Sequence, residues 1–452
     1  MKLSVIAQKT QGQLFGQDLD VCQFSTDTRT LKAGDVFIAL SGANFDANSF
    51  VAKAQQLGAV AAIVTQYQAD VPLSQIVVAN TQTALGLLAK AWREQFELMR
   101  VAMTGSSGKT TTKELTASIF RQAGETLATL GNKNNEIGVP LTLLRLTAEH
   151  RYGVFELGAN HLGEIAYTSG LVQPHAAVIT NIGTAHLEGF GSRQGIAQAK
   201  GEIFSGLVEG GTAVINADDE FADYHQTLCE GKKTLTFAVK KTADVYATDI
   251  KRSNGGAYQF MLHIAEQSAP IQLALIGQHN VANALAACCL ALACGLTLPQ
   301  IKQGLESAQG AAGRMVLHRC QGFTLIDDTY NANPDAMKAA IDELALCEGH
   351  KFVVLGAMGE LGENAASLHQ QVGAYAQAKQ IDALYCVGAF SQNTAQGYGA
   401  TAQRFETQAE LIAALVKSMP QGATILVKGS RSARMENVVQ AVLGFDSAQP
   451  TR

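Results

Sequence analysis

The sequence predicts an α/β protein of three domains, and three observations support this fold class. Its 452 residues are enough for about three domains of ordinary size, each with its own core. Hydrophobic residues make up 47% of the chain and charged residues 16%, which is typical of a globular protein with large cores. Short apolar stretches alternate with longer helical patterns along most of the sequence, as in parallel sheets covered by helices.

The first domain is expected over residues 1–82, where the pattern is mixed. Residues 34–40 and 60–65 are short apolar runs typical of buried strands. Residues 49–58 form a helical pattern that ends at Gly58. These features predict a small α/β unit.

The second domain is expected over residues 83–312. Four stretches have the composition of parallel strands: 98–105, 152–159, 176–183 and 212–218. Helical patterns cover 83–96, 195–207 and 279–295. Short polar segments separate three further strand candidates: 244–250, 257–265 and 270–276. This spacing predicts a small antiparallel sheet beside the parallel one.

The third domain is expected over residues 313–452, where the alternation of strands and helices resumes. Strand candidates lie at 323–328, 351–358, 382–390 and 423–429. Helices are predicted at 334–347 and from about residue 433 onward. This stretch predicts a second α/β unit of ordinary domain size.

A glycine-rich turn lies between the predicted strand at 98–105 and a predicted helix. It contains Gly105, Ser106, Ser107, Gly108, Lys109, Thr110 and Thr111. Met103 replaces the first glycine of the general phosphate-loop pattern, but a phosphate site needs only a strand, small residues that expose backbone N–H groups, and a helix N-terminus. We therefore predict a phosphate-binding loop rather than a solvated turn.

Three other side chains stand where metal or phosphate chemistry could use them. Glu156 ends an apolar strand, His186 follows another strand among glycines, and Lys200 lies on a predicted helix. Each has an ordinary structural explanation: a helix-cap partner, a structural histidine and a solvated lysine. Only their combination with the phosphate loop favours a site.

Composition and other motifs exclude several classes of protein. Asn132-Lys133-Asn134-Asn135 has an amide where guanine readers need a carboxylate, and no kinase lysine and aspartate sets occur. The net charge is −5 with scattered basic residues, so no nucleic-acid partner is expected. We find no apolar run of membrane-spanning length and no secretory leader, and the dispersed cysteines fit a reduced cytoplasm.

A set of stretches in the same order resembles the Mur ligases of bacterial cell-wall synthesis. They lie at 25–50, 104–112, 131–146, 156–165, 184–204, 277–287, 311–314, 327–337 and 426–436. Within that family they are most similar to the branch that adds a dipeptide. The phosphate loop of this family is itself shorter than the general pattern, which accounts for Met103.

The resemblance implies a fold and a reaction. The implied fold has an N-terminal domain for the UDP end of the substrate, a central ATPase domain and a C-terminal Rossmann-like domain. The implied reaction joins D-alanyl-D-alanine to UDP-N-acetylmuramoyl-tripeptide with ATP and two Mg²⁺ ions, through an acyl phosphate. A monomer is the family expectation.

The resemblance also implies roles for individual residues. Lys109 would contact phosphates, Thr110 and Glu156 would hold one Mg²⁺, and His186 and Lys200 would serve the other. Further ATP contacts would come from Asn283, Arg314, Asp328 and Asn331. The UDP substrate would meet Asp27, Arg29, Asn134 and Asn135, and the acceptor dipeptide Ser430 and Arg431. For each of the four UDP-substrate residues, a solvated loop is an equally good explanation. Arg431 follows the last predicted strand, where an arginine could pair with the carboxylate of a dipeptide through two hydrogen bonds.

Lys200 matches a lysine that is carbamylated in the family, which would turn a cation into an anion beside the second metal ion. Carbamylation needs the neutral amine. An ordinary lysine is neutral in only about one molecule per thousand at neutral pH. The resemblance therefore predicts that Lys200 is buried or lies near other cations.

Three alternatives remain open. One is a sister ligase that adds a single amino acid, or a folyl-polyglutamate synthetase. Another is a binding protein that uses the nucleotide only to change shape, and the last is an interaction protein with a vestigial loop. Because the substrates arrive on three domains, the main interpretation predicts domain closure with hinges near residues 82 and 312.

Overall fold

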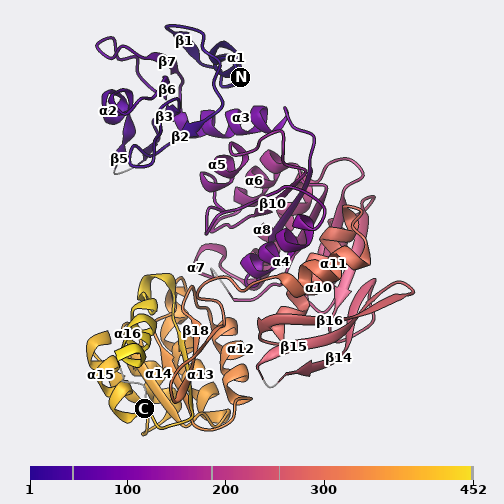
Figure 1. Cartoon of the computed structure of the whole chain (residues 1–452), viewed down its shortest axis with the longest axis vertical. Helices are drawn as coiled ribbons and strands as arrows, with labels where there is room; N and C mark the ends of the chain where they lie inside the picture. Colours follow the sequence, from indigo (N-terminus) through magenta and orange to yellow (C-terminus); the bar gives the residue numbers. More distant parts are fainter. Residues whose placement is uncertain (43–44, 185–186, 254, 449–452) are drawn as a thin grey trace.

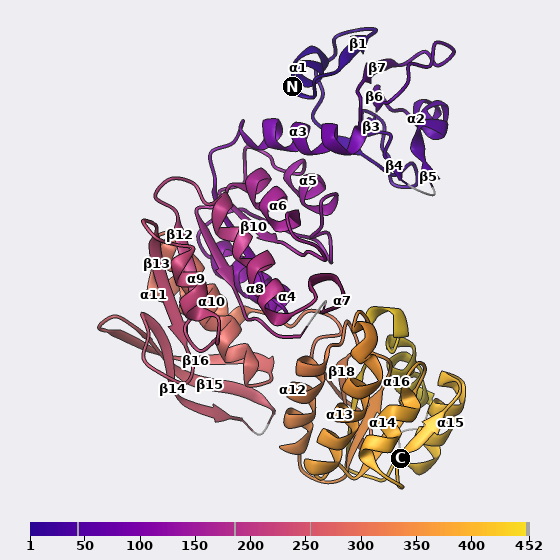
Figure 2. The ribbon, with the colours of Figure 1, turned by 180° about the vertical axis from the view of Figure 1, so that it is seen from behind.

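The computed structural model describes residues 1–42, 45–184, 187–253 and 255–448. The chain forms three bodies in a row, each built around its own sheet (Figures 1 and 2). The N-terminal body lies at one end, the sheet that carries the glycine-rich loop lies in the middle, and the C-terminal body packs against the other end. The predicted α/β class, with parallel sheets in three bodies, is therefore confirmed.

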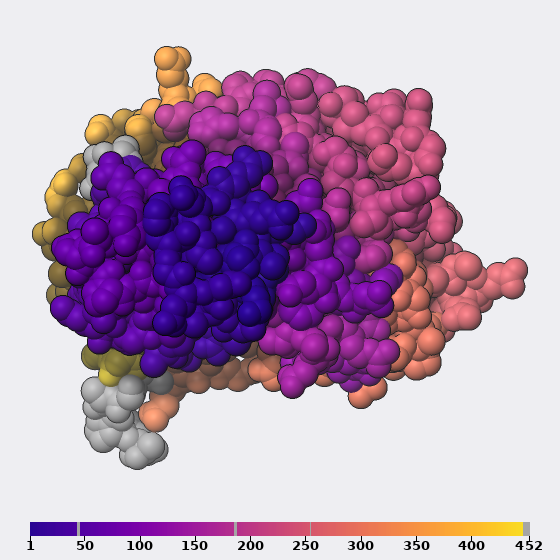
Figure 3. Space-filling model, turned by 90° about the horizontal axis from the view of Figure 1, so that it is seen from above, coloured from indigo at the N-terminus to yellow at the C-terminus, as the bar shows by residue number. Residues whose placement is uncertain are grey.

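The N-terminal body contains a sheet of five strands. Its order is β1 (Gln13–Phe15), β7 (Ser74–Val77), β6 (Ala61–Val64), β3 (Val36–Ile38) and β2 (Phe24–Ser25). Only β1 pairs antiparallel to its neighbour. The predicted helix forms as α2 (Val51–Gln56) after a 3-10 turn (Ala47–Phe50), and Gly58 follows it with φ of +97°. A short α1 (Leu3–Lys9) and a hairpin of β4 (Ser41–Gly42) and β5 (Phe45–Asp46) complete this body, which Figure 3 shows end-on.

The central body contains a sheet of nine strands. Its parallel part runs β9 (Thr126–Ala128), β10 (Tyr152–Glu156), β8 (Met99–Thr104), β11 (Ala176–Ile179), β12 (Thr212–Asn216) and β13 (Lys233–Ala238). Side chains alternate between the two faces, so Val101 and Met103 join one core while Ala102 joins the other.

Helices cover both faces of this sheet. On one face lie α4 (Lys109–Arg121), α10 (His279–Ala293) and α11 (Leu298–Ser307). On the other lie α5 (Gly138–Leu143), α6 (Glu164–Val172) and α8 (Arg193–Gly201), while α7 (Leu187–Phe190) and α9 (Ala222–Thr227) are short. The predicted segment 195–207 divides into α8 and a 3-10 turn (Glu202–Gly206). Cys288 and Cys289 are buried in α10, and Cys294, which follows this helix, is half-buried.

The three predicted antiparallel strands continue the central sheet. They are β14 (Val245–Arg252), β15 (Ala257–Ile264) and β16 (Gln267–Ile276). They pair antiparallel with one another, and β14 joins the parallel strands through Phe237 and Ala238 of β13. The antiparallel strands are thus an extension of the parallel sheet toward the C-terminal body.

The C-terminal body has six strands with helices on both faces. The order is β17 (Val316–Arg319), β18 (Phe323–Asp328), β22 (Ala423–Lys428), β19 (Lys351–Leu355), β20 (Ala383–Val387) and β21 (Gln403–Phe405). One face carries α12 (Pro334–Ala345), α13 (Ala365–Ala378) and α14 (Ser391–Tyr398). The other carries α15 (Gln408–Ser418) and α16 (Glu436–Ala448). Only β17 is antiparallel, so the rest is a doubly wound parallel sheet.

Helix α3 (Thr81–Arg93) connects the N-terminal and central bodies. Its apolar face contacts α5 and α6, and Trp92 meets the Phe24 ring edge-on with ring centroids 5.3 Å apart. One continuous apolar core runs from the N-terminal sheet through α3 into the central body. Residue 82 lies in the first turn of α3, and the boundary predicted there stays a prediction. Over the described ranges, no helix is long and apolar enough to cross a membrane.

Candidate active site

The glycine-rich turn closes tightly between β8 and α4. Gly105 and Gly108 have φ of +152° and +79°, values that favour glycine. A Cβ atom would lie 1.8 Å from Thr180 Oγ1 at Gly105 and 2.3 Å from Asn283 Oδ1 at Gly108. The backbone can pass here only without side chains, and the N-terminal amides of α4 are left facing the adjoining cavity.

Lys109 and the two serines complete the loop. The Lys109 ammonium donates to the Gly105 carbonyl at 2.7 Å, and burial lowers its pKa while the Glu156 carboxylate opposes this shift. Ser107 donates from its backbone N–H to Asn181 Oδ1 at 3.1 Å, and Ser106 Oγ accepts from the Gly183 N–H at 2.9 Å. The segment that follows the neighbouring strand β11 therefore holds the loop in a fixed shape.

Glu156 lies at the carboxyl end of β10, next to the start of α4. It is 2% exposed, and its Oε2 accepts from the Thr110 hydroxyl at 2.8 Å. Its Oε1 accepts from Asn134 Nδ2 at 2.8 Å, and its backbone N–H donates to Thr129 Oγ1 at 3.0 Å. Arg314 Nη2 donates to Thr110 Oγ1 at 2.9 Å. A buried carboxylate and a hydroxyl oxygen side by side are ligands of the kind that Mg²⁺ prefers.

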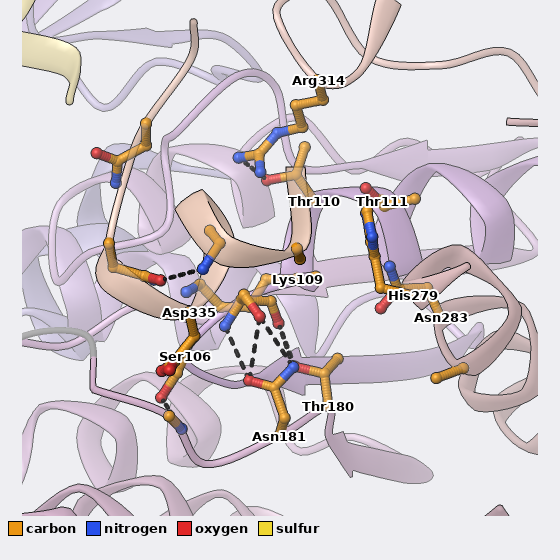
Figure 4. Close-up of a pocket in the computed structure, with 18 of the residues that line it drawn as sticks. Ser106, Lys109, Thr110, Thr111, Thr180, Asn181, His279, Asn283, Arg314 and Asp335 are labelled. Atoms are coloured by element: carbon orange, nitrogen blue, oxygen red, sulfur yellow. Dashed lines mark hydrogen bonds between the residues drawn. The ribbon is translucent and has the colours of Figure 1, made fainter. Parts of the chain in front are cut away.

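Helix α10 forms the wall opposite the loop. Asn283 and Asn280 face the same way, because they are three residues apart on a helix, and Asn283 Nδ2 donates to Asn280 Oδ1 at 2.8 Å. Asn280 in turn donates to the Ile276 carbonyl at 2.7 Å. His279 lies beside Asn283 in Figure 4 and lines the same cavity. These buried amides are held in fixed orientations before any ligand arrives.

The C-terminal body supplies the third wall. The Arg314 guanidinium stacks on the Tyr330 ring at 4.2 Å from its centroid. Asp328 Oδ2 is 2.5 Å from Lys428 Nζ, and both side chains are nearly buried. Lys428 also donates to the Asn331 carbonyl at 3.0 Å, so the ends of β18 and β22 are joined at the cavity. Asp335 Oδ2 accepts from the backbone N–H and hydroxyl of Thr184 at 2.9 and 2.8 Å, which bridges the two bodies.

These walls enclose a cavity of about 550 Å³, a volume within the range of small-molecule sites. Figure 4 shows Arg314 facing Thr110, and Thr180 and Asn181 pointing to the loop. Ten of the eleven residues predicted to bind nucleotide line it: Ser106, Ser107, Gly108, Lys109, Thr110, Thr111, Asn283, Arg314, Asp328 and Asn331. The eleventh, Gly105, contributes the carbonyl that holds Lys109. Residues more than 200 positions apart thus meet at one site.

Lys200 is 1% exposed on α8, close to the Phe190 ring at 5.9 Å. Burial, with a smaller contribution from the positive charge of Lys109, holds the pKa of its ammonium well below the ordinary value. Across the described ranges it forms no ion pair with a carboxylate. The burial predicted from the resemblance is therefore present.

His186 lies outside the described residues, so its predicted metal role stays a prediction. In the part of the chain that the structure describes, no three His, Cys, Asp or Glu side chains cluster as metal ligands. Glu156 is instead joined by the hydroxyl of Thr110 and the amide of Asn134.

A second cavity of about 660 Å³ adjoins the first and shares Lys109 and Asn331 with it. Ser430 and Arg431, which follow β22, line this second cavity. Ser430 Oγ is 3.0 Å from Ser432 Oγ, and Arg431 forms an ion pair with Glu436 at 3.2 Å.

The residues predicted for the UDP end lie away from both cavities. Arg29 forms an ion pair with Asp27 at 2.7 Å, and its hydrogen bonds lower the pKa of the Asp27 carboxyl to about 2. Asn135 Oδ1 accepts from the Gly138 N–H at 2.9 Å at the start of α5. Only Asn134 reaches the site, through Glu156. The structure does not bring these four residues together around one cavity in its described part.

Sequence reasoning missed several residues that shape the site: Thr180, Asn181, His279, Tyr330 and Lys428. Asn181 follows β11, which lies beside β8, so the rule that ligands bind at the carboxyl ends of parallel strands could have found it. Asp335 lies in the first turn of α12, within the helix predicted at 334–347, but its bridge to Thr184 has no local signal.

Comparison with known proteins gives consistent matches over almost the whole chain. Family models for the Mur ligase middle domain and for the Mur ligase, glutamate ligase domain match residues 103–291 and 313–431. The UDP-N-acetylmuramoyl-tripeptide–D-alanyl-D-alanine ligase of Escherichia coli K12 is 45% identical over 446 residues, which cover 97% of this chain and 98% of that protein.

Solved structures match as well. A crystal structure of MurF from Acinetobacter baumannii has a TM-score of 0.92 and 40% identity, and the match covers 98% of both chains. MurF ligase from Thermotoga maritima in complex with ADP has a TM-score of 0.84 and 29% identity, over 93% of this chain and 96% of that one. These matches agree with a cavity that combines a phosphate loop with residues of two bodies, and they show that the chain belongs to the Mur ligase family.

Proposed function

We propose that this chain is an ATP-dependent ligase that joins D-alanyl-D-alanine to UDP-N-acetylmuramoyl-tripeptide and releases ADP and phosphate. The observation that carries the proposal is the pair of adjoining cavities: one lined by the phosphate loop and Arg314, the other reaching Lys109 from the side of Ser430. Relatives with that reaction in their names match almost the full chain.

The reaction has to convert a carboxylate into an electrophile. The terminal carboxylate of the tripeptide attacks the γ-phosphorus of ATP, which gives an acyl phosphate and ADP. The amine of the dipeptide then attacks the acyl carbon, and phosphate leaves from the tetrahedral intermediate. Lys109 would hold the transferred phosphate, and Arg314 would compensate its charge from the other body.

The nucleotide would occupy the 550 Å³ cavity. Asn283 would meet the adenine edge, since its amide is fixed by Asn280, and Asp328 would accept from the ribose. Asp328 is already bonded to Lys428, which would orient the carboxylate. Asn331 would complete this end of the site.

Thr110 and Glu156 have the donor chemistry for Mg²⁺, which would supply charge compensation for the phosphates. A second ion would be held by His186 and by Lys200 as its carbamate. The burial of Lys200 supports carbamylation, because the neutral amine is the form that adds CO₂. A carbonyl resonance from ¹³C-labelled bicarbonate that is present in the wild type and absent in Lys200→Arg would support the carbamate; equal spectra would contradict it.

Each of the three bodies would bind a different substrate. Residues 1–82 would bind the UDP end through Asp27 and Arg29, with Asn134 and Asn135 near the muramoyl group. Residues 83–312 would bind ATP, and 313–452 would bind the acceptor dipeptide in the second cavity, which Ser430 and Arg431 line. A monomer suffices in this proposal, because the described residues of one chain line both cavities.

The test is phosphate release from ATP with Mg²⁺ and UDP-N-acetylmuramoyl-tripeptide, with and without D-alanyl-D-alanine. We expect release that depends on the dipeptide, with a UDP-muramoyl-pentapeptide identified by mass. Lys109→Ala should abolish it, whereas Lys302→Gln, on the surface of α11, should not. Release that depends on a single amino acid with a shorter precursor would assign the chain to a sister ligase. No stimulation by any amine would favour a nucleotide switch.

A further inference from the structure

The second cavity carries a pattern of charge that the proposed reaction does not yet use. Besides Lys109, Ser430 and Arg431, it is lined by Glu360 and Arg434. Glu360 follows β19, and Arg434 ends the short turn after β22. One carboxylate and two guanidinium groups in a single cavity match a zwitterion, a molecule with an ammonium at one end and a carboxylate at the other.

The backbone at both residues is unusual. Glu360 has φ of +60° and Arg434 φ of +49°, in the left-handed region that non-glycine residues rarely adopt. Such conformations are strained in residues other than glycine, and they occur preferentially at functional sites. Two such residues therefore line one cavity, and this observation supports a binding site independently of their charges.

The end of the cavity near Glu360 is the end where bond formation would occur. The negative charge of Glu360 acts on the Lys109 ammonium, so the two side chains are electrostatic neighbours. Lys109 also lines the nucleotide cavity, next to the loop that would hold the transferred phosphate. An ammonium held at Glu360 is therefore delivered to the side of the cavity that faces the activated carbonyl.

The two arginines are not equivalent. Arg431 already forms an ion pair with Glu436 at 3.2 Å. Arg434 has no carboxylate partner among the residues that the structure describes, and its side chain is exposed to the cavity. A dipeptide spans roughly 7 Å when extended, and a cavity of about 660 Å³ is large enough to hold one.

We infer that Glu360 receives the ammonium of the acceptor dipeptide and that Arg434, rather than Arg431, binds its terminal carboxylate. This inference rests on the proposed function and adds residue roles to it. The acceptor is thereby specified as a free zwitterionic dipeptide: an acceptor without the carboxylate would lose the contact with Arg434, and an acceptor without the ammonium the contact with Glu360.

The test compares D-alanyl-D-alanine with D-alanyl-D-alaninamide, which keeps the ammonium but lacks the carboxylate. Rates of pentapeptide formation would be measured by mass for the wild type, Arg434→Gln, Arg431→Gln and Glu360→Gln. A charge-assisted hydrogen bond makes us expect a wild-type preference for the free dipeptide of about tenfold to a hundredfold in kcat/KM. Arg434→Gln should reduce this preference to within about threefold, and the matched variant Arg431→Gln should retain it.

Glu360→Gln should raise the KM for both acceptors by about tenfold and leave their ratio unchanged, since both keep the ammonium. The KM for ATP should stay within about twofold, which shows that the fold and the nucleotide site are intact. A preference retained in Arg434→Gln, a preference lost in Arg431→Gln, or an unchanged acceptor KM in Glu360→Gln would overturn the inference. If the wild type forms no pentapeptide, the proposed function itself fails, so the two failures are distinguishable.

Discussion

A buried carboxylate of α12 connects the C-terminal body to the antiparallel strands of the central sheet. Glu343 Oε1 accepts from the Tyr258 hydroxyl at 2.8 Å and from the Gln278 backbone N–H at 2.7 Å, and Arg252 Nε lies 3.6 Å from its Oε2. Both Glu343 and Tyr258 are less than 5% exposed. Figures 1 and 2 show α12 on the side of the C-terminal body that faces these strands. We predict that this contact keeps the central and C-terminal bodies docked against each other.

The perturbation is Glu343→Gln, which keeps the size of the side chain and removes its charge. Two hydrogen bonds to a charged acceptor, each about 1.5–3 kcal/mol, become bonds to a neutral one of about 0.5–1.5 kcal/mol. The loss is about 2 kcal/mol for the pair, and the partly exposed Arg252 contact adds up to about 1 kcal/mol. Since 1.4 kcal/mol is a factor of ten, separation of the bodies should become about thirtyfold to a hundredfold more favourable.

The assay is limited proteolysis with trypsin at Arg314, which hydrogen-bonds to Thr110 while the bodies are docked. When opening and closing are fast, cleavage follows the population of the open form, so Glu343→Gln should be cut there about thirtyfold faster or more. The matched control is Asp342→Asn on the same helix. Asp342 pairs with Lys379 at 2.6 Å within the C-terminal body, and its loss should not change cleavage. Equal rates for the two variants would refute the reasoning.

Two further predictions concern the loop and the response to pH. Gly108→Ala should weaken the binding of an ATP analogue at least about tenfold, measured by calorimetry, because the added Cβ would meet Asn283. The control is Gly131→Ala, which is also at positive φ but in open space and should cost only about 1 kcal/mol of stability. Unchanged binding in Gly108→Ala would contradict this prediction. Burial lowers the pKa of His225, whose Nε2 is 3.2 Å from the Ala197 carbonyl. Its stabilising contribution is therefore complete above its unfolded pKa of about 6.5 and declines as the pH falls below it. His225→Gln should flatten the acid side of the thermal-midpoint profile, and an identical profile would exclude this role.

Local patterns identified most of the elements and the nucleotide-binding loop. The strand, the small residues and the helix of the phosphate loop are consecutive in the chain, so residues 98–123 alone predict the loop. Apolar runs such as Val36–Ile38 and Ala61–Val64 form strands for the same reason. Short strands such as β7 and β9 were missed, because three or four residues carry too little periodicity and are stabilised mainly by their neighbours.

The meeting of distant residues could not be read from the chain. Lys428 reaches Asp328 because β22 lies beside β18, an order of strands that the sequence does not state. The bridges of Thr184 to Asp335 and of Arg252 to Glu343 likewise depend on how two separate sheets pack.

By itself, then, the sequence determined the α/β class, the phosphate loop, and the residue types around it, because these follow from local propensity and periodicity. Only the tertiary structure decided that Lys200 is buried, that Arg431 is engaged by Glu436 while Arg434 faces the second cavity, and that α12 connects two bodies. The physical reason is that burial and charge pairing depend on contacts between segments far apart in the chain, which appear only once the sheets have packed.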